Sequence, residues 1–248
     1  MAKKIAILNF KGGVGKTTTA VNICAALAIM KKRTLLIDMD GQCNATFILD
    51  YHVGDGLTLY DSLADETLST PLPIYEYRKN FDFVPASIQL RKVSDRTLVN
   101  TLDYLIQQEE TDYDYIIIDC PPGDGILNDN AMAAVQDVII PCDGDELSMQ
   151  GVSTLLARIN QFRKLSNKTL NQPHFLMTKF DQRLRLHKDS ARELRETFPQ
   201  QVLNARIRTN ARLRETPSAH QTIFEYDPTS SGATDYMQLA KEIIKTGI

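Results

Sequence analysis

Short apolar runs alternate along this chain with segments in which apolar residues recur at helical spacing. The runs predict buried strands at residues 5–8, 33–38, 81–86, 115–119, 137–142 and 174–181. The helical spacing predicts helices at residues 19–30, 58–63, 94–108, 148–165 and 235–244. Strands that alternate with helices in this way favour an α/β fold, with a doubly wound, mostly parallel sheet and helices on both faces.

The helix expected at residues 94–108 has an apolar stripe formed by Leu98, Leu102, Leu105 and Ile106. We expect this stripe to face the core, with Ser94 as the N-cap. The chain has 248 residues, a length that suits one α/β domain with a large core or two small domains. The regular alternation of strands and helices favours one domain over residues 1–248.

Composition narrows the class of protein. Hydrophobic content of 43% and charged content of 24% are ordinary for a soluble globular protein. No apolar run is long enough to cross a bilayer, and residues 1–4 lead directly into a strand and not into a signal peptide. The four cysteines lack C-x-x-C spacing, which favours reduced thiols in a cytoplasmic protein.

The strongest chemical signal is a glycine-rich segment, residues 11–18, between the first strand and the first helix. Glycines let backbone N–H groups close around a phosphate, and the start of a helix adds unpaired donors and a positive dipole end. We expect Lys16 to reach the β- and γ-phosphates of a nucleotide and Thr17 to bind Mg²⁺. The expected nucleotide-binding residues of this segment are Gly12, Gly13, Val14, Gly15, Lys16, Thr17 and Thr18. The first glycine of the usual P-loop pattern would fall at Phe10, and the alternative is a turn that binds nothing.

Acidic residues end the predicted strands at residues 33–38 and 115–119, at the edge of the sheet where α/β proteins bind ligands. Asp119 ends the apolar run that begins at residue 115, a Walker B pattern in which the carboxylate holds Mg²⁺ directly or through water. Asp38 ends the strand at residues 33–38, and Asp40 lies in the turn that follows. Asp38 and Asp40 therefore either take part in the chemistry of a ligand-binding site or only cap the turn through hydrogen bonds to its backbone.

Positive charge is concentrated in one part of the chain, although the net charge is −3. Residues 158–214 contain fourteen Lys and Arg against four Asp and Glu, which leaves a net charge of −13 for the remainder. This asymmetry predicts either a surface for a polyanion or a set of solvated helix faces.

Residues 11–18, Lys-Gly-Gly-Val-Gly-Lys-Thr-Thr, resemble the deviant Walker A motif of the ParA/MinD group of P-loop ATPases. In that group the early lysine reaches across a nucleotide-sandwich dimer to the phosphates bound by the other subunit. The resemblance implies an ATP-dependent homodimer in which Lys11 contacts the nucleotide of the second copy. It implies that the catalytic residues are Lys11, Lys16 and Asp40.

Residues 38–42 resemble the Asp-x-Asp-Pro-Gln segment of the same group, with Gly41 in place of proline. By this match Asp40 orients the attacking water. The implied metal residues, which would support the Mg²⁺ shell, are Thr17, Asp38 and Asp119.

Residues 119–122 resemble the Asp-x-Pro-Pro segment of the group, whose backbone moves with the γ-phosphate. The group usually continues with serine, whereas this chain continues with Gly123, Asp124 and Gly125. The resemblance offers no role for the extra acid at Asp124.

Residues 207–218 resemble a further segment of the group, in which Asn210 falls on the adenine-contacting position and Arg212 on a position used for DNA. Arg208 replaces the usual proline, and Thr229 and Ser231 replace two common arginines. Lost phosphate contacts could have moved to other basic residues, and the DNA-binding candidates are Arg183, Arg185, Arg208 and Arg212.

The predicted strand at residues 174–181 ends in polar residues, where related nucleotide folds place the base. Thr178 and Asp181 are therefore either base contacts or helix caps.

The resemblance extends from residue 4 to about residue 241 and is closest to the ParA/Soj branch. It implies a Mg²⁺-dependent ATPase that dimerises with ATP, binds nonspecific DNA of the nucleoid and hydrolyses ATP slowly. A ParB-like or cargo-adaptor protein would stimulate hydrolysis and release, and so segregate or position a plasmid, a chromosome or another large cargo.

Two alternatives stay open. A MinD-like membrane ATPase needs a C-terminal amphipathic helix, and residues 241–248 are short and lack aromatic residues, so no membrane partner is expected. The other alternative is a different protein on the same fold. A metal-cluster carrier needs cysteines that face a partner subunit. A biosynthetic enzyme needs a small-molecule substrate that raises the rate of ATP turnover.

Overall fold

The computed structural model describes residues 1–52, 54, 56–93, 98–144 and 149–248. The strands within these ranges are β1 (Lys3–Ile7), β2 (Thr34–Asp38), β3 (Tyr75–Arg78), β4 (Phe81–Val84), β5 (Tyr115–Asp119), β6 (Asp137–Asp143), β7 (His174–Phe180) and β8 (Val202–Arg208). The helices are α1 (Lys16–Ile29), α2 (Asn44–Ile48), α3 (Leu59–Ala64), α4 (Thr101–Glu109), α5 (Ile126–Ala134), α6 (Met149–Leu165), α7 (Arg185–Thr197), α8 (Ala211–Ala219), α9 (Ile223–Tyr226) and α10 (Ser231–Thr246). Two 3-10 helices are η1 (Ile88–Lys92) and η2 (Glu110–Asp112).

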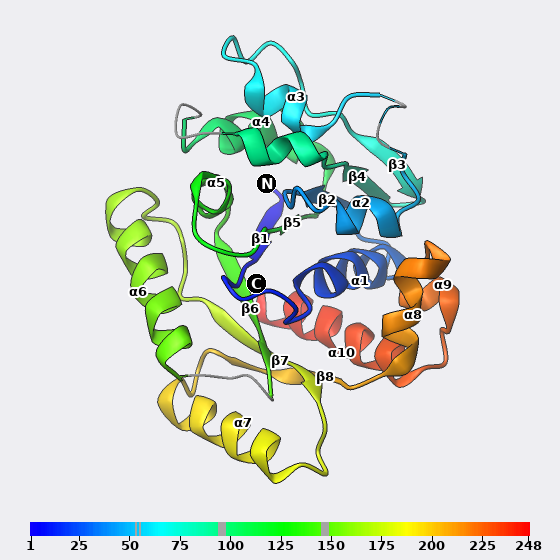
Figure 1. Ribbon diagram of the computed structural model, residues 1–248, viewed down its shortest axis with the longest axis vertical. Coiled ribbons are helices and arrows are strands. Elements are labelled where there is room, and N and C mark those ends of the chain that lie inside the picture. Colours follow the sequence, from blue (N-terminus) through cyan, green and yellow to red (C-terminus); the bar gives the residue numbers. More distant parts are fainter. Residues whose placement is uncertain (53, 55, 94–97, 145–148) are drawn as a thin grey trace.

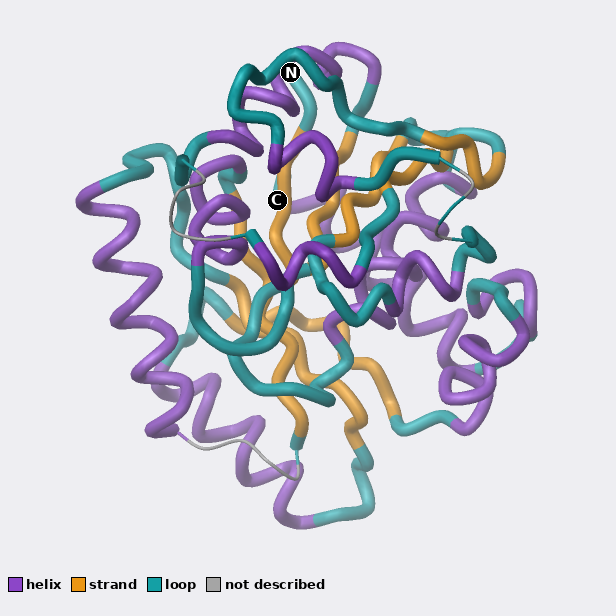
Figure 2. The backbone as a smooth tube through the Cα atoms, turned by 45° about the horizontal axis from the view of Figure 1, so that its top comes forward, coloured by secondary structure: helices purple, strands orange, loops and turns teal. Residues whose placement is uncertain are grey.

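The strands form one sheet in the order β3-β4-β2-β5-β1-β6-β7-β8 (Figures 1 and 2). β3 pairs antiparallel with β4, and the other neighbours pair in parallel. The fold is therefore α/β with a mostly parallel, doubly wound sheet, as the alternation of elements predicts. Because the parallel strands end at the same edge, the loops after β1, β2 and β5 come together there.

The central strands are apolar on both faces because helices cover both faces. Leu35 and Ile37 of β2 face one core, in which α4, α5, α6 and α7 also take part. Leu36, between them, faces the other core, which is formed largely by α1 and α10. Figure 1 shows α1 and α10 side by side on that face of the sheet, with α4, α5 and α6 on the opposite face. This double burial explains why the strands read as continuous apolar runs.

Each strand predicted from an apolar run is present, within three residues at either end. The helix predicted at residues 94–108 is wrong at its start, since α4 begins at Thr101. Leu102, Leu105 and Ile106 are buried as expected, but Leu98 precedes the helix and is 66% exposed. The proposed N-cap Ser94 lies outside the described residues.

The periodicity did not predict seven short or charged elements: α2, β3, α5, α7, β8, α8 and α9. β8 is an edge strand whose burial alternates, with Leu203, Ala205 and Ile207 inside and polar residues between them. That alternation breaks the apolar run on which the strand prediction depends.

Candidate active site

The loop between β1 and α1 has the backbone of a phosphate-binding turn. Gly13 and Gly15 have φ of 78° and 91°, the left-handed region that side chains disfavour. Gly15 is the N-cap of α1, whose first N–H groups have no partner within the helix and lie at the positive end of its dipole. Residues 12–18 therefore have the geometry to hold a phosphate at the start of α1.

The two lysines of this loop lie in different environments. Lys16 is 7% exposed, and its Nζ donates a hydrogen bond to the carbonyl of Lys11 at 2.9 Å. Burial lowers the pKa of Lys16, and the nearby Asp119 carboxylate opposes that shift. Lys11 is exposed. One lysine thus lies inside the loop beside the acids, and the other lies on the surface of the loop.

Asp38 and Asp119 are neighbours because β2 and β5 pair in parallel, with Asp38 opposite Asp119 in the register. Both are fully buried. Asp38 accepts hydrogen bonds from the Asp40 N–H at 3.0 Å and from the N–H and hydroxyl of Thr46 at 2.8 and 2.7 Å. Burial raises the pKa of Asp38 to about 6. The oxygens of Asp38 therefore fix the turn that carries Asp40.

Asp119 is the carboxylate best placed to hold a cation. Neither of its oxygens accepts a hydrogen bond of good geometry from the described residues. Burial, reinforced by Asp38, raises the pKa of Asp119 well above its usual range, although the Thr17 hydroxyl and Lys16 act to lower it. A buried carboxylate in this position is costly unless a cation or a proton satisfies it. Asp119 and the Thr17 hydroxyl therefore fit Mg²⁺, which prefers oxygen ligands.

The turn after β2 carries Asp40, which is 9% exposed and accepts a hydrogen bond from the Gln42 N–H at 2.9 Å. At the next position, Gly41, a Cβ atom would lie 2.9 Å from Cγ of Arg91. Real Cβ atoms rarely come that close to another atom, so the Arg91 side chain fills the space that a proline ring needs. The sequence did not reveal this contact because Arg91, in η1, is distant along the chain.

A small cavity of about 80 Å³ lies on the side of the P-loop that faces β7 and α8. Gly15, Thr178 and Asn210 are among the residues that line it. The Thr178 hydroxyl donates a hydrogen bond to the Val14 carbonyl at 2.8 Å, which ties β7 to the P-loop. The Asn210 side-chain amide donates to the Ser231 hydroxyl at 2.7 Å. Thr178 and Asn210 are thus close together beside the P-loop.

Asp181 does not line this cavity. Its carboxylate accepts hydrogen bonds from the backbone and guanidinium of Arg183, at distances between 2.6 and 3.2 Å. Asp181 therefore shapes the turn before α7, and of the two residues considered for base contact, Thr178 is the one beside the P-loop.

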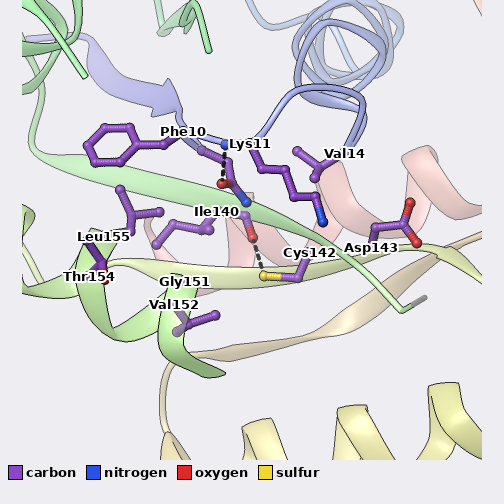
Figure 3. A pocket seen from close by; sticks show the side chains of 11 residues that line it. Phe10, Lys11, Val14, Ile140, Cys142, Asp143, Gly151, Val152, Thr154 and Leu155 are labelled. Atoms are coloured by element: carbon purple, nitrogen blue, oxygen red, sulfur yellow. Dashed lines mark hydrogen bonds between the residues drawn. The ribbon is translucent and has the colours of Figure 1, made fainter. Parts of the chain in front are cut away.

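A second cavity, of about 340 Å³, lies between the P-loop, β6 and α6. Figure 3 shows Phe10 and Lys11 on one side of it and Val152 and Leu155 of α6 on another. Its lining is mostly apolar, so α6 packs loosely over the residues that precede the phosphate-binding turn.

The four predicted DNA-binding arginines lie in two groups. Arg183 and Arg185, at the start of α7, have side chains that are 87% and 95% exposed. Arg208 pairs with the buried carboxylate of Asp235 at 2.6 Å. Arg212 pairs with Glu215 at 3.0 Å and with Asp227 at 3.5 Å. Carboxylates also pair with Arg183 and Arg185, those of Asp181 at 2.6 Å and Asp189 at 3.4 Å, so the two groups differ in accessibility and not in pairing.

A groove between α7 and β8, here called the α7 groove, is lined by Lys188, Arg192, Arg195 and Arg206 together with Ala191 and Glu196. Within the described ranges, Lys188, Arg195 and Arg206 form no ion pair with a carboxylate. Burial, and the charge of Arg195, lower the pKa of Arg206. Arg192 pairs with Asp189 at 2.8 Å, and Glu196 is the acid in the lining. Four cations against one lining carboxylate favour an anion between them. The individual positions were not singled out from the sequence because two elements bring them together.

The cysteines are placed as packing residues. Cys24, Cys120 and Cys142 are buried, and Cys43 is partly buried. Burial raises the pKa of the Cys120 and Cys142 thiols. A metal cluster shared with a partner needs accessible thiolates, so this placement disfavours a cluster carrier.

Comparisons with known proteins agree with this geometry. A family model described as "AAA domain" matches residues 2–172. The chain is 39% identical to the sporulation initiation inhibitor protein Soj of Bacillus subtilis over 100% of both chains. It is 36% identical to the chromosome partitioning protein ParA of Myxococcus xanthus, over 97% of this chain and 87% of that protein. A solved structure named cobyrinic acid a,c-diamide synthase from Mycobacterium smegmatis, with a bound ATP analogue and magnesium, matches with a TM-score of 0.84 and 26% identity, over 100% of this chain and 98% of that one.

Proposed function

The chain belongs to the ParA/Soj family of P-loop ATPases, and we propose that it works as a single ATPase unit, residues 1–248, which segregates or positions a large cargo. It is an ATPase that uses ATP and Mg²⁺. The observation that carries the proposal is the 39% identity to Soj over the whole chain. The convergence of the P-loop, the Asp40 turn and Asp119 at one edge of the sheet supports it. The names of relatives described as chromosome-partitioning proteins support a chromosome as the cargo, and a plasmid or another large assembly is the alternative.

In the proposed reaction, the backbone of residues 12–18 and the Lys16 ammonium bind the phosphates, and Asp40 orients the attacking water. Thr17 and Asp119 would hold Mg²⁺, which supplies positive charge beside the β- and γ-phosphates. Asp38 contributes by fixing the Asp40 turn through its own hydrogen bonds. Asn210 and Thr178 line the cavity that the base would enter.

We propose that the ATP-bound form is a homodimer in which Lys11 reaches the nucleotide of the other subunit. The exposure of Lys11, on a loop whose other lysine is buried, supports this role. The Lys11 backbone is held in place, since its N–H donates a hydrogen bond to the Asn9 side chain at 3.0 Å. The position of the Lys11 backbone is therefore fixed.

We propose nonspecific DNA, as found in the nucleoid, as the surface that this dimer binds. The α7 groove, Arg183 and Arg185 place six Lys and Arg side chains on and around α7, with Asp181, Asp189 and Glu196 among them. Lys and Arg contacts to phosphates give affinity without sequence preference. Arg208 and Arg212 would contribute less, because their side chains are only 44% and 55% exposed. A ParB-like or cargo-adaptor protein would stimulate hydrolysis and release the dimer from DNA.

The two alternative functions have less support. Within the described residues, no helix is both long enough and apolar enough to cross a membrane. The C-terminal helix α10 is not free to lie on a membrane surface, because Leu239, Ala240 and Ile243 are buried in the core next to α1. A biosynthetic activity of the kind named for the Mycobacterium smegmatis neighbour would appear as ATP turnover that needs a small-molecule substrate and neither DNA nor a protein partner.

Retention on nonspecific double-stranded DNA tests the proposal directly. It is measured with ATP, with ADP and without nucleotide, using Asp40→Ala to hold the ATP-bound form. We expect retention only with ATP, and a steep loss of retention as salt is raised. No retention in any nucleotide state would reject the DNA part of the proposal and leave the ATPase itself in place.

The DNA surface is tested by Lys188→Glu, which reverses one charge in the α7 groove. We expect DNA retention to fall about tenfold and the dependence of log affinity on log salt to lose about one unit of slope. The matched control is Lys79→Glu, which makes the same change in net charge at an exposed lysine in the turn between β3 and β4. Equal retention by the two variants would place the DNA surface elsewhere.

A further inference from the structure

The loop after β5, residues 121–125, lies directly against the P-loop. The N–H of Gly123 donates a hydrogen bond to the carbonyl of Phe10 at 2.8 Å. The buried side-chain amide of Asn128, in α5, donates to the Gly123 carbonyl at 2.7 Å and to the Pro121 carbonyl at 3.3 Å. The backbone of the loop is therefore held between the P-loop and α5, next to the position of the phosphates.

Asp124 places an acid in this loop, one residue beyond the contact with the P-loop. Gly123 has φ of 83°, and glycines flank Asp124 on both sides, so the segment has little stiffness of its own. An unneutralised carboxylate beside the phosphate site would repel ATP. A cation that pairs with Asp124 would remove this repulsion and would also anchor the flexible segment.

Arg158 of α6 provides that group. Its Nε lies 3.3 Å from Oδ1 of Asp124, and its Nη2 lies 2.5 Å from Oδ1 of Asp129 in α5. The Arg158 side chain is 26% exposed, and its guanidinium also lies over the Phe162 ring, 5.9 Å from the ring centroid. Two carboxylates and an aromatic ring therefore fix the position of the Arg158 guanidinium, and the Asp124 side chain that it holds is 53% exposed.

The same helix connects this pair to the P-loop a second time. Val152 and Leu155 precede Arg158 by one to two turns of α6 and line the cavity above Phe10 (Figure 3). Phe10 is also the residue whose carbonyl accepts the hydrogen bond from Gly123. The loop, α6 and the start of the P-loop therefore form one connected unit, closed by the Asp124–Arg158 pair.

We propose that Arg158 is a positioning residue for ATP hydrolysis, which neutralises Asp124 and fastens the loop at residues 121–125 to α6. Arg158 acts through Asp124 and the loop, not by contact with the reacting atoms. The inference rests on the ATPase activity of the chain and requires no DNA binding. It gives Asp124, which the family resemblance leaves without a role, a place in the site.

The charge part of the proposal is tested by Arg158→Ala, with binding of a fluorescent ATP analogue and Mg²⁺ as the measurement. Removal of the guanidinium leaves Asp124 unpaired beside the phosphates, so we expect affinity to fall about three- to tenfold. The loss should shrink as salt is raised, because screening weakens the repulsion. The double variant Arg158→Ala/Asp124→Asn should recover most of the affinity, since the repelling charge is gone.

The positioning part is tested by Asp124→Asn alone. This variant removes the loop anchor without leaving an unpaired acid, so we expect KM for ATP to stay within about twofold and kcat to fall about threefold or more. Asp129→Asn is the matched control, because it weakens the other contact of Arg158 and leaves the Asp124–Arg158 pair intact. Thermal unfolding of every variant checks that the fold is retained.

Two results would overturn the proposal. One is wild-type affinity for the ATP analogue in Arg158→Ala. The other is equal weakening in Arg158→Ala and in the double variant, which would mean that α6 is disturbed without any part played by the Asp124 charge. Both results would leave the DNA-positioning function untouched, because the measurements contain no DNA.

Discussion

Lys16→Ala is expected to abolish nucleotide binding at micromolar concentrations. Lys16 is the buried cation of the P-loop; the residue is 7% exposed and lies near the Asp119 and Asp40 carboxylates. Its loss removes the charge-assisted hydrogen bonds to the β- and γ-phosphates and leaves these two carboxylates without the neighbouring cation. We expect Kd for ATP to rise by at least about a hundredfold, which corresponds to about 2.7 kcal/mol.

Isothermal titration with Mg²⁺ and ATP is the measurement for Lys16→Ala, and thermal unfolding shows whether the protein is still folded. Lys16→Gln keeps a donor for the Lys11 carbonyl, so it shows whether binding is lost because the charge is gone or because the turn is damaged. The matched control is Lys11→Ala. Because Lys11 is exposed, its loss should leave binding by the monomer intact and prevent the ATP-dependent dimer. Micromolar ATP binding by Lys16→Ala would reject the assignment of the P-loop.

Asp40→Ala is expected to bind ATP nearly as well as the wild type and to hydrolyse it about a hundredfold more slowly. Asp38 accepts a hydrogen bond from the Asp40 N–H and so stabilises the turn that carries Asp40. This turn lies beside the P-loop and is not part of it. Removal of its carboxylate takes away the group that orients water and leaves the phosphate contacts of residues 12–18 in place. ATP-bound dimers should therefore accumulate.

Phosphate release under single-turnover conditions measures the chemical step for Asp40→Ala, and size-exclusion chromatography with ATP measures the dimer. Asp38→Asn is an informative companion, because Asp38 is fully buried and supports the Asp40 turn through Thr46 and the Asp40 N–H. We expect it to lower both turnover and stability, whereas Asp40→Ala lowers turnover alone. Unchanged turnover in Asp40→Ala would remove Asp40 from the catalytic role.

Arg91 gives the Asp40 turn a feature specific to this chain. Because the Arg91 side chain fills the space above Gly41, introduction of the proline that is usual in the family would force Arg91 to move. The glycine at this position is therefore matched to a contact made by η1, and the turn keeps its shape without a proline ring.

Local information in the sequence was sufficient for the six strands between the edge strands β3 and β8, and for recognition of the phosphate-binding turn. A central parallel strand must be apolar on both faces, so its residues form an unbroken run that can be recognised without knowledge of its neighbours. The P-loop can be recognised for the same reason, since a phosphate-binding turn needs its glycines, lysine and threonine within a few consecutive residues. Asp38 and Asp119 each follow such a run, which predicted that they end strands.

Only the tertiary structure decided which groups act together across the chain. The pairing of β2 with β5 brings Asp38 beside Asp119, and the position of α6 brings Arg158 to Asp124. The α7 groove forms where α7 meets β8, and Asp235 offsets the charge of Arg208. In each case the interaction energy depends on the distance between the two groups in space, and this distance cannot be read from their spacing along the chain. The sequence by itself determined the six inner strands and the phosphate-binding turn, and the packing of the elements determined which charged side chains lie together.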